Sequence, residues 1–289
     1  MILPVLIYLF LFCYKPMYGL VIAFKDYKIT RGIDGSNWSD PWYKWFLNFF
    51  TDPYFGRLLK NTFMISGLTI LFGFPAPIIL ALMINEVKNS AFKRTVQTIT
   101  YMPYFISMVV LCGLLKTFCM QDGLFAQIAV LFGGKAQNYL ANPSYFRTIY
   151  VLSDIWSGIG WNSIIYLAAL SSIDQEQYEA ARVDGANRFK QMIHITLPGL
   201  VPTIMVLFIL RMGNILNVGY EKILLLYNSA TYSTADVIST YTYRLSFGGS
   251  GNPMYSKSTA IGLFNTIINV FFLMLTNMIS KKATDAGLF

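Results

Sequence analysis

Long uninterrupted runs of apolar residues recur along this chain of 289 residues. Each run approaches the roughly 20 residues that an α-helix needs to cross the hydrocarbon core of a bilayer. Strands of a membrane barrel alternate apolar and polar residues, so continuous runs rich in Leu, Ile, Phe and Met favour helices. The pattern predicts an all-α membrane protein, a single transmembrane domain over 1–289, with six transmembrane helices within residues 2–24, 62–84, 95–119, 145–170, 200–226 and 258–279.

The composition suits a bilayer, since 55% of the residues are hydrophobic and only 12% are charged. A net charge of +8 is ordinary for a membrane protein, whose basic loop ends lie beside anionic lipid, and does not indicate nucleic-acid binding. Lys and Arg are denser in the segments after the second and fourth runs and in the C-terminal tail. By the positive-inside rule, both termini are expected on the cytoplasmic side.

Residues 25–60 combine turn residues with a dense group of aromatic side chains. Aromatic residues gather at membrane interfaces, so this extracytoplasmic segment is expected to form a surface helix resting on the outer leaflet. A platform on which sugar rings stack is the sharper alternative. The aromatic residues are Trp38, Trp42, Tyr43, Trp45, Phe46, Phe49 and Phe50.

The sequence contains no catalytic or nucleotide-binding motif. A GxxxxGK[ST] phosphate loop is absent, because the segment Ser256-Lys257-Ser258 lacks the glycine before lysine. One histidine, His194, cannot build a His-rich metal site, and the three cysteines lack metal-ligand spacing. The chain is therefore expected not to be an enzyme and to bind no cofactor or metal itself.

Polar residues recur within three of the apolar runs, where such groups are costly and therefore functional candidates. In the fifth run, Arg211, Asn214, Asn217 or Val218, and Glu221 recur at helical spacing and predict a polar stripe along one side of a helix. They either hydrogen-bond between helices as structural glue or line a hydrated path for a hydroxyl-rich substrate. The candidates for that path are Tyr104, Asp154, Trp161, Asn162, Tyr166, Arg211, Asn214, Asn217, Glu221, Asn265 and Asn269.

A charged stretch, QYEAARVDGANRFKQMIHITLP (177–198), separates the fourth and fifth apolar runs. Asp174 lies three residues before Gln177, a spacing typical of a capped helix start. We therefore predict a short helix over 175–184. Gly185 is expected to end it, because glycine readily takes the left-handed conformation that closes the last turn of a helix.

After this turn, Asn187 can cap a second short helix over 188–194, which is expected to stop before Pro198. A plain connection between bundle helices needs only about two to eight residues. The longer helix-turn-helix therefore favours an element that docks onto another protein, with two helices lying on lipid as the alternative.

The same stretch carries a spaced motif. Glu179-Ala180-Ala181 is followed by three residues, Gly185, nine residues, Ile195, one residue and Leu197-Pro198. This is similar at every position to the E-A-A-x3-G-x9-I-x-L-P motif of the permease subunits of binding-protein-dependent ABC importers. Six spans with this loop between the fourth and fifth resemble the type I importer permease fold of the maltose and methionine permeases. The segments PMYGLVIAFKDY (16–27) and GNILNVGYEKILLLYN (213–228) resemble the branch that imports oligosaccharides and polysaccharide fragments.

The resemblance implies a permease in a bacterial cytoplasmic membrane and a set of partners for it. A second homologous permease subunit would complete the pore, and two cytoplasmic ATPase subunits would bind ATP and Mg²⁺ and supply the energy. An extracytoplasmic solute-binding protein would deliver an oligosaccharide. Residues 171–198 would be the cytoplasmic coupling loop, with its ATPase contact drawn from Tyr178, Glu179, Ala180, Ala181, Arg182, Asp184, Gly185, Phe189, Ile195, Leu197 and Pro198.

The polar residues alone would also permit a self-sufficient secondary transporter or channel for a polar solute. Such a protein is expected to have broken helices in corresponding halves and an internal ion site. The coupling motif would have no use in it.

Overall fold

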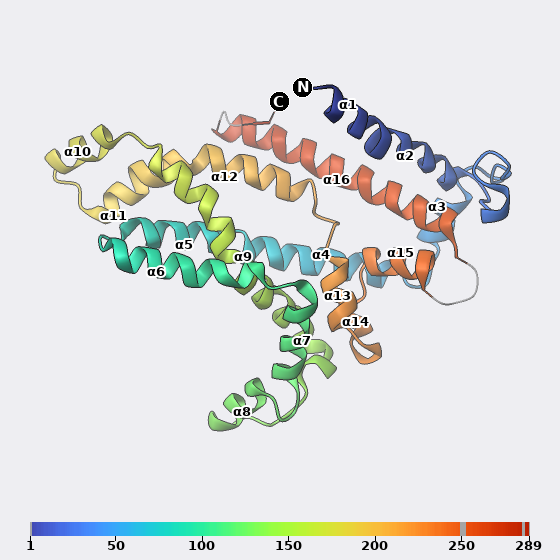
Figure 1. Cartoon of the computed structure of the whole chain (residues 1–289), viewed down its shortest axis with the longest axis horizontal. Coiled ribbons are helices and arrows are strands. Elements are labelled where there is room, and N and C mark those ends of the chain that lie inside the picture. Colours follow the sequence, from blue (N-terminus) through green and yellow to red (C-terminus); the bar gives the residue numbers. More distant parts are fainter. Residues whose placement is uncertain (1, 249–252, 285–286, 289) are drawn as a thin grey trace. The chain divides into compact units, whose positions relative to one another are not determined.

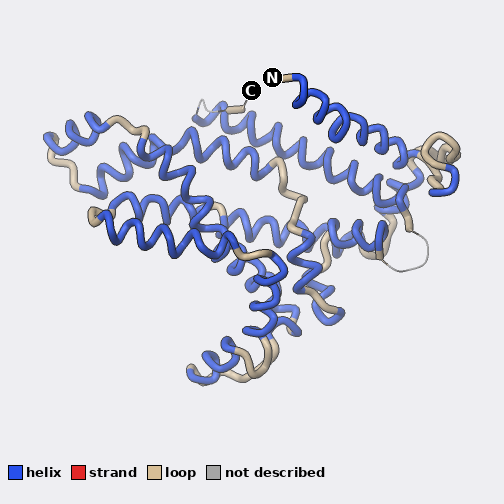
Figure 2. The backbone as a smooth tube through the Cα atoms, viewed as in Figure 1, coloured by secondary structure: helices blue, strands red, loops and turns tan. Residues whose placement is uncertain are grey.

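The computed structural model describes residues 2–248, 253–284 and 287–288, and these are almost entirely helical (Figure 1; Figure 2). Among them no strand forms, and only two isolated β-bridges occur, Lys25 with Trp38 and Lys28 with Gly32. The all-α prediction is confirmed. The α-helices are α1 (Leu3–Leu9), α2 (Lys15–Met17), α3 (Lys44–Phe50), α4 (Phe55–Leu68), α5 (Pro75–Glu86), α6 (Ser90–Tyr101), α7 (Met108–Cys119), α8 (Leu124–Leu131), α9 (Pro143–Ser171), α10 (Gln175–Val183), α11 (Arg188–Gln191), α12 (Leu197–Met212), α13 (Tyr220–Leu226), α14 (Tyr232–Ala235), α15 (Ile238–Phe247) and α16 (Tyr255–Thr284).

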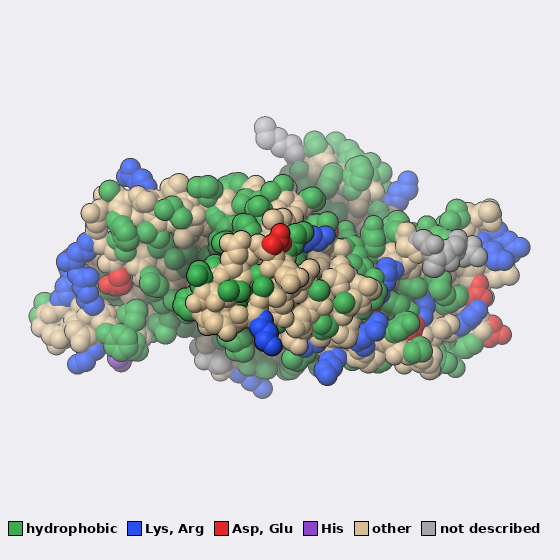
Figure 3. Space-filling view, turned by 90° about the horizontal axis from the view of Figure 1, so that it is seen from below, with side chains coloured by type: hydrophobic (Ala, Val, Ile, Leu, Met, Phe, Trp, Pro, Cys, Tyr) green, Lys and Arg blue, Asp and Glu red, His purple; other side chains and the backbone are tan. Residues whose placement is uncertain are grey.

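Five stretches of helix in the described part of the chain are long and apolar enough to cross a membrane. The predicted fourth run, 145–170, forms α9, which at 29 residues is also long enough but is not among these five. The predicted number of six is reached when α9 is counted with them. Apolar side chains are spread over the face drawn in Figure 3, as expected of a surface against lipid. The five are Leu3–Phe24, Phe55–Glu86, Met108–Leu131, Arg188–Met212 and Tyr255–Lys282.

The predicted third span, 95–119, is not one helix. Helix α6 ends at Tyr101, a 3₁₀ turn covers Met102–Phe105, and α7 starts at Met108. Pro103 has no N–H to continue the hydrogen-bond ladder, and the side chain of Ser107 caps the new helix. The prediction was wrong here because the apolar residues continue across the break and only these local features mark it.

The predicted fifth span, 200–226, is also interrupted. Helix α12 ends at Met212 and α13 starts at Tyr220, so the residues between them are not helical. Side chains from other helices bind the backbone groups that this break frees: Asn269 accepts from the N–H of Leu216 at 3.0 Å, and Ser66 donates to the carbonyl of Ile215. Such compensation is what permits irregular backbone at membrane depth. The predicted polar stripe along one continuous helix was therefore wrong.

The chain divides into two compact units, Met1–Thr62 with Asp236–Ile268 and Phe63–Ala235 with Asn269–Phe289. Helices α4 and α16 contribute residues to both. Apolar side chains form the core of each unit. The first core contains Phe49, Leu58, Ile238, Tyr241 and Ile261, and the second contains Ala81, Tyr166, Leu170 and Leu200.

Residues 25–60, in the first unit, form a folded loop followed by the seven-residue helix α3 rather than one surface helix. The indole of Trp45 donates to the carbonyl of Lys25 at 3.1 Å and to Ser39 Oγ at 2.9 Å, which holds the loop together. Phe49 is buried, whereas Trp38 and Trp42 are exposed. The aromatic residues thus divide between core and surface. Their lipid-facing role, like the extracytoplasmic location of the segment, stays a prediction.

Two buried carboxylates link helices within the first unit. Asp236 is fully buried and receives Arg57 at 3.2 Å and Arg244 at 2.8 Å. Asp52 pairs with Lys257 at 2.6 Å, and each of these side chains is less than a tenth exposed. The pairs of Arg57 with Asp236 and of Lys257 with Asp52 join residues 179 and 205 positions apart, so neither was visible in the sequence.

Candidate functional site

The charged stretch between α9 and α12 begins with the helix that its sequence predicts. Helix α10 covers Gln175–Val183, and Asp174 caps it by accepting a hydrogen bond from the N–H of Glu176 at 3.0 Å. This cap satisfies one of the backbone donors that a helix start leaves unpaired. The predicted first helix is confirmed.

Gly185 makes the turn. Its φ is +74°, in the left-handed region that glycine adopts without steric cost. The N–H of Gly185 donates to the carbonyl of Arg182 at 3.1 Å, and the N–H of Ala186 donates to that of Ala181 at 2.8 Å. These two bonds define a Schellman motif. Nothing lies within 4 Å of a Cβ built on Gly185, so the backbone conformation alone demands glycine here.

The second helix starts as predicted but does not stop. Asn187 caps it by accepting from the N–H of Lys190 at 2.9 Å. Helix α11 then continues through a π-helical turn, Met192–Thr196, into α12, so that one helix runs from Arg188 to Met212. The π turn gives the backbone a wider turn just before Pro198, whose missing N–H therefore does not end the helix. The predicted stop before Pro198 was wrong.

The residues expected at an ATPase contact fall into two groups. Tyr178, Ala181 and Ile195 are only partly exposed, and the hydroxyl of Tyr178 hydrogen-bonds with that of Thr196 at 3.0 Å, which ties α10 to the following helix. The others are exposed and available to a partner, together with Val183, which is 89% exposed and was missed in the sequence. The exposed members are Glu179, Ala180, Arg182, Asp184, Gly185, Phe189, Leu197 and Pro198.

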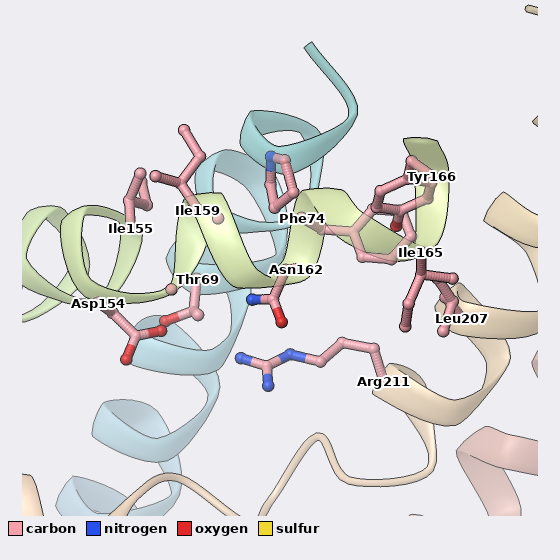
Figure 4. Close-up of a pocket in the computed structure, with 13 residues that line it drawn as sticks. Thr69, Phe74, Asp154, Ile155, Ile159, Asn162, Ile165, Tyr166, Leu207 and Arg211 are labelled. Atoms are coloured by element: carbon pink, nitrogen blue, oxygen red, sulfur yellow. The ribbon is translucent and has the colours of Figure 1, made fainter. Parts of the chain in front are cut away.

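A polar cavity of about 210 Å³ lies within the second unit, where α9 and the end of α12 meet the π turn Thr69–Gly73. Figure 4 shows the amide of Asn162 and the guanidinium of Arg211 directed toward each other, with Asp154 beside Thr69. Asp154, Gly158 and Asn162 line it together because residues four apart share one side of a helix. Tyr166 closes the same wall.

A second cavity of about 240 Å³ continues from the first, since Thr69, Asp154 and Arg211 line both. Its other polar residues come mainly from the break after α12, including Asn214 and Asn217. The break thus places these two amides in the same cavity as Asp154, although they do not continue the helix that carries Arg211. Four of the eleven path candidates line this second cavity, and two more, Asn162 and Tyr166, line the first.

Lys222 supports this site and was missed in the sequence. Its side chain is only 2% exposed, and its ammonium donates to the carbonyl of Tyr150 at 3.0 Å and lies 3.4 Å from Asp154 Oδ1. The ammonium also lies over the ring of Tyr150, 4.5 Å from its centre. A lysine so deeply placed needs a carboxylate nearby. The helical spacing from Arg211 predicted a role for Glu221, the neighbour of Lys222, instead. Glu221 is exposed, whereas Lys222 is the residue that lies beside the cavity.

The remaining path candidates lie elsewhere. Tyr104 and Trp161 stack on each other with their ring centres 4.6 Å apart and line neither cavity. Glu221 is exposed outside both cavities, and Asn265 belongs to the first unit. Asn269 binds the backbone of the break and so acts as the structural glue that was the alternative.

Comparison with known proteins decides the family. The family described as "Binding-protein-dependent transport system inner membrane component" matches residues 73–285, which include the helix-turn-helix and most of the residues that line the two cavities. The chain belongs to this family. It is therefore a multi-pass permease of the inner membrane and not an enzyme, as the spaced motif indicated.

Similar permeases are known in sequence and in structure. The permease is 42% identical to "Protein LplB" of Bacillus subtilis over 100% of this chain and 90% of that protein. It is 43% identical to the B. subtilis "Polygalacturonan/rhamnogalacturonan transport system permease protein YteP" over 100% of this chain and 89% of that protein. A crystal structure of a bacterial alginate ABC transporter in complex with an alginate pentasaccharide-bound periplasmic protein contains a chain that is 44% identical, with a TM-score of 0.89, and the match covers 99% of the permease and 94% of that chain.

The match to that solved chain confirms the type I importer permease fold. The contact of the helix-turn-helix with an ATPase, and of the cavities with a substrate, are not shown by it and stay predictions.

Proposed function

We propose that this permease carries an oligosaccharide across the bacterial cytoplasmic membrane as part of an importer driven by ATP hydrolysis. The observation that carries the proposal is that one helix connects the exposed helix-turn-helix to the polar cavities in a chain of this family. This helix, Arg188–Met212, starts in the helix-turn-helix and ends at the cavities. A passive pore would need only the cavities.

The walls of the cavities support a sugar as the substrate. Their amides and hydroxyls donate and accept hydrogen bonds, which matches the hydroxyl groups of a carbohydrate. Among the described lining residues, no cluster of carboxylates is present that would suit a small metal cation, since Asp154 is the only acid. Relatives named for polygalacturonan, rhamnogalacturonan and alginate transport point in the same direction.

The proposed mechanism is alternating access. Two ATPase subunits, carrying ATP and Mg²⁺, approach each other when they bind nucleotide, and residues 171–198 move with them. The permease and a second, homologous permease subunit then exchange an inward-open for an outward-open state. A solute-binding protein on the outer side supplies the sugar. In this arrangement residues 171–198 and both termini are cytoplasmic, and 25–60 is extracytoplasmic.

A secondary transporter or channel is the competing function, and the helix break at 213–219 is a feature that such proteins use. The two are separated by purification of the affinity-tagged permease from its native membrane. We expect an ATPase and a second permease to accompany it, and uptake of oligosaccharide into vesicles to require ATP. Uptake by this chain alone, driven by an ion gradient and without an ATPase, would reject the proposal.

A further inference from the structure

The two cavities contain an uneven set of charges. Among the described residues that line them, Asp154 is the only acid and Arg211 the only permanently charged base. Lys222 adds a second positive charge, because it touches Asp154 from inside the protein. Two cations and a single carboxylate therefore lie at these cavities.

Asp154 pairs with Lys222 rather than with Arg211. The side chain of Lys222 is almost fully buried, so its charge cannot be satisfied by water. Its only other polar contact among the described residues is the carbonyl of Tyr150. Asp154 is 40% exposed and lies 3.4 Å from the ammonium, so it neutralises Lys222 on one side and faces the cavity on the other.

Arg211 is left without a counter-ion. Within the described chain, its guanidinium has no ion pair and no hydrogen bond, although it lines both cavities and is exposed to them. The amide side chains that line the cavities with it, Asn162, Asn214 and Asn217, are uncharged. A cation within a membrane-spanning helix is costly, so its presence indicates a functional role. The planar guanidinium donates in a fixed fork that fits a carboxylate with two parallel hydrogen bonds.

We infer that Arg211 binds a carboxylate of the transported molecule and that the permease therefore prefers an acidic oligosaccharide, built from uronic acid units, to a neutral one. The inference rests on the proposed function and adds the charge class of the substrate and the residue that selects it. Asp154 and Lys222 are positioning residues, which together keep one positive charge available in the cavity.

The test uses the complete importer, this permease with its partner subunits and binding protein, in vesicles of zwitterionic lipid. This lipid excludes an anionic headgroup as the ligand of Arg211, and repeating the assay with anionic lipid added shows whether headgroups compete. The probes are a short oligogalacturonide and the same oligosaccharide with its carboxyl groups reduced to alcohols. Each variant is compared with the wild type for each sugar separately, so that the preference of the binding protein cancels.

Three variants separate charge from structure. Arg211→Gln removes the charge, Arg211→Lys keeps it without the fork, and Lys116→Gln removes a positive charge from an exposed position on α7 that lines no cavity described above. We expect Arg211→Gln to lower uptake of the acidic sugar about tenfold or more, the loss expected for one charge-assisted hydrogen bond. Uptake of the reduced sugar should stay within about twofold. Arg211→Lys should recover part of the acidic uptake, and Lys116→Gln should behave as wild type.

Other results overturn the inference. Equal loss of both sugars in Arg211→Gln, with no recovery in Arg211→Lys, would make Arg211 structural, and unchanged acidic uptake would remove it from recognition. If the wild type carries only the neutral sugar, the inference fails and the proposed function stands. If ATP drives uptake of neither sugar, the proposed function itself fails.

Discussion

The helix-turn-helix of residues 174–198 and the cavity around Asp154 differ in how far apart in sequence their shaping contacts lie. In the former, the two caps and the turn at Gly185 join residues two to five positions apart. In the latter, Asp154 meets Lys222 across 68 positions, and Asn269 reaches Leu216 across 53. The loop is therefore specified by local backbone preference, and the cavity by packing between helices. Substitutions in the two regions should therefore have different effects on the protein.

The largest effect is expected at Gly185. Gly185→Val should abolish uptake while the protein still inserts into the membrane, because a β-branched residue resists positive φ. Co-purification of the ATPase should fall together with uptake. Gly185→Asn is the matched control, since asparagine tolerates the left-handed region and a side chain has room there. Wild-type uptake by Gly185→Val would contradict our account of the turn.

The buried pair should respond asymmetrically. Asp154→Asn leaves Lys222 buried without a counter-ion and should destabilise the protein by about 3 kcal/mol. Lys222→Met should cost less, about 1 to 2 kcal/mol, because the freed Asp154 carboxylate can reach water. The double variant should recover much of the loss. Thermal unfolding in detergent measures these differences, and strictly additive losses in the double variant would show that the two residues do not act as a pair.

A smaller effect is expected at the cap of the second loop helix. Asn187→Ala removes the hydrogen bond to the N–H of Lys190 and should cost about 1 kcal/mol of local stability. Because this cap is local, amide hydrogen exchange should rise in α11 and remain unchanged around Asp154. Asn187→Ser, which keeps a capping oxygen, should resemble wild type. A change in exchange at the cavity would show that the two regions are coupled more tightly than their contacts indicate.

The smallest effect is expected on the pH dependence of stability, through the pair of Asp52 and Lys257 in the first unit. Burial acts to raise the pKa of Asp52, but hydrogen bonds from Lys257 and Tyr241 outweigh it and hold that pKa below its usual value. The stability from Asp52 is therefore complete above the ordinary carboxyl pKa and is lost as the pH falls through the lowered one. Thermal midpoints measured over acidic pH should fall less steeply in Asp52→Asn than in wild type. Parallel profiles would remove Asp52 as the source of the acid sensitivity.

Local rules let the sequence predict the all-α class, the first loop helix and the left-handed glycine. They failed where an apolar run hides a break, at Pro103 and after Met212, because hydropathy does not record which backbone hydrogen bonds are made. The cavity was found in part, since Asp154 and Asn162 share one side of α9. Lys222 was missed because its role depends on contacts with Tyr150 and Asp154 on another helix. No spacing along the chain reveals such contacts.

The helix from Arg188 to Met212 has a mechanical consequence. Its 25 residues correspond to about 37 Å of axial rise, and the polypeptide leaves the helical path after Met212. A tilt imposed where Asn187 starts this helix is therefore passed along the helix to Arg211, which lines both cavities with Asp154. The π turn at Met192–Thr196 and Pro202, which lies inside the helix, are the points along it where such a tilt can be absorbed. The distance between the helix-turn-helix and the cavities is then set by the length of this helix. Shortening the helix by one turn should uncouple the two regions even when both ends keep their native residues.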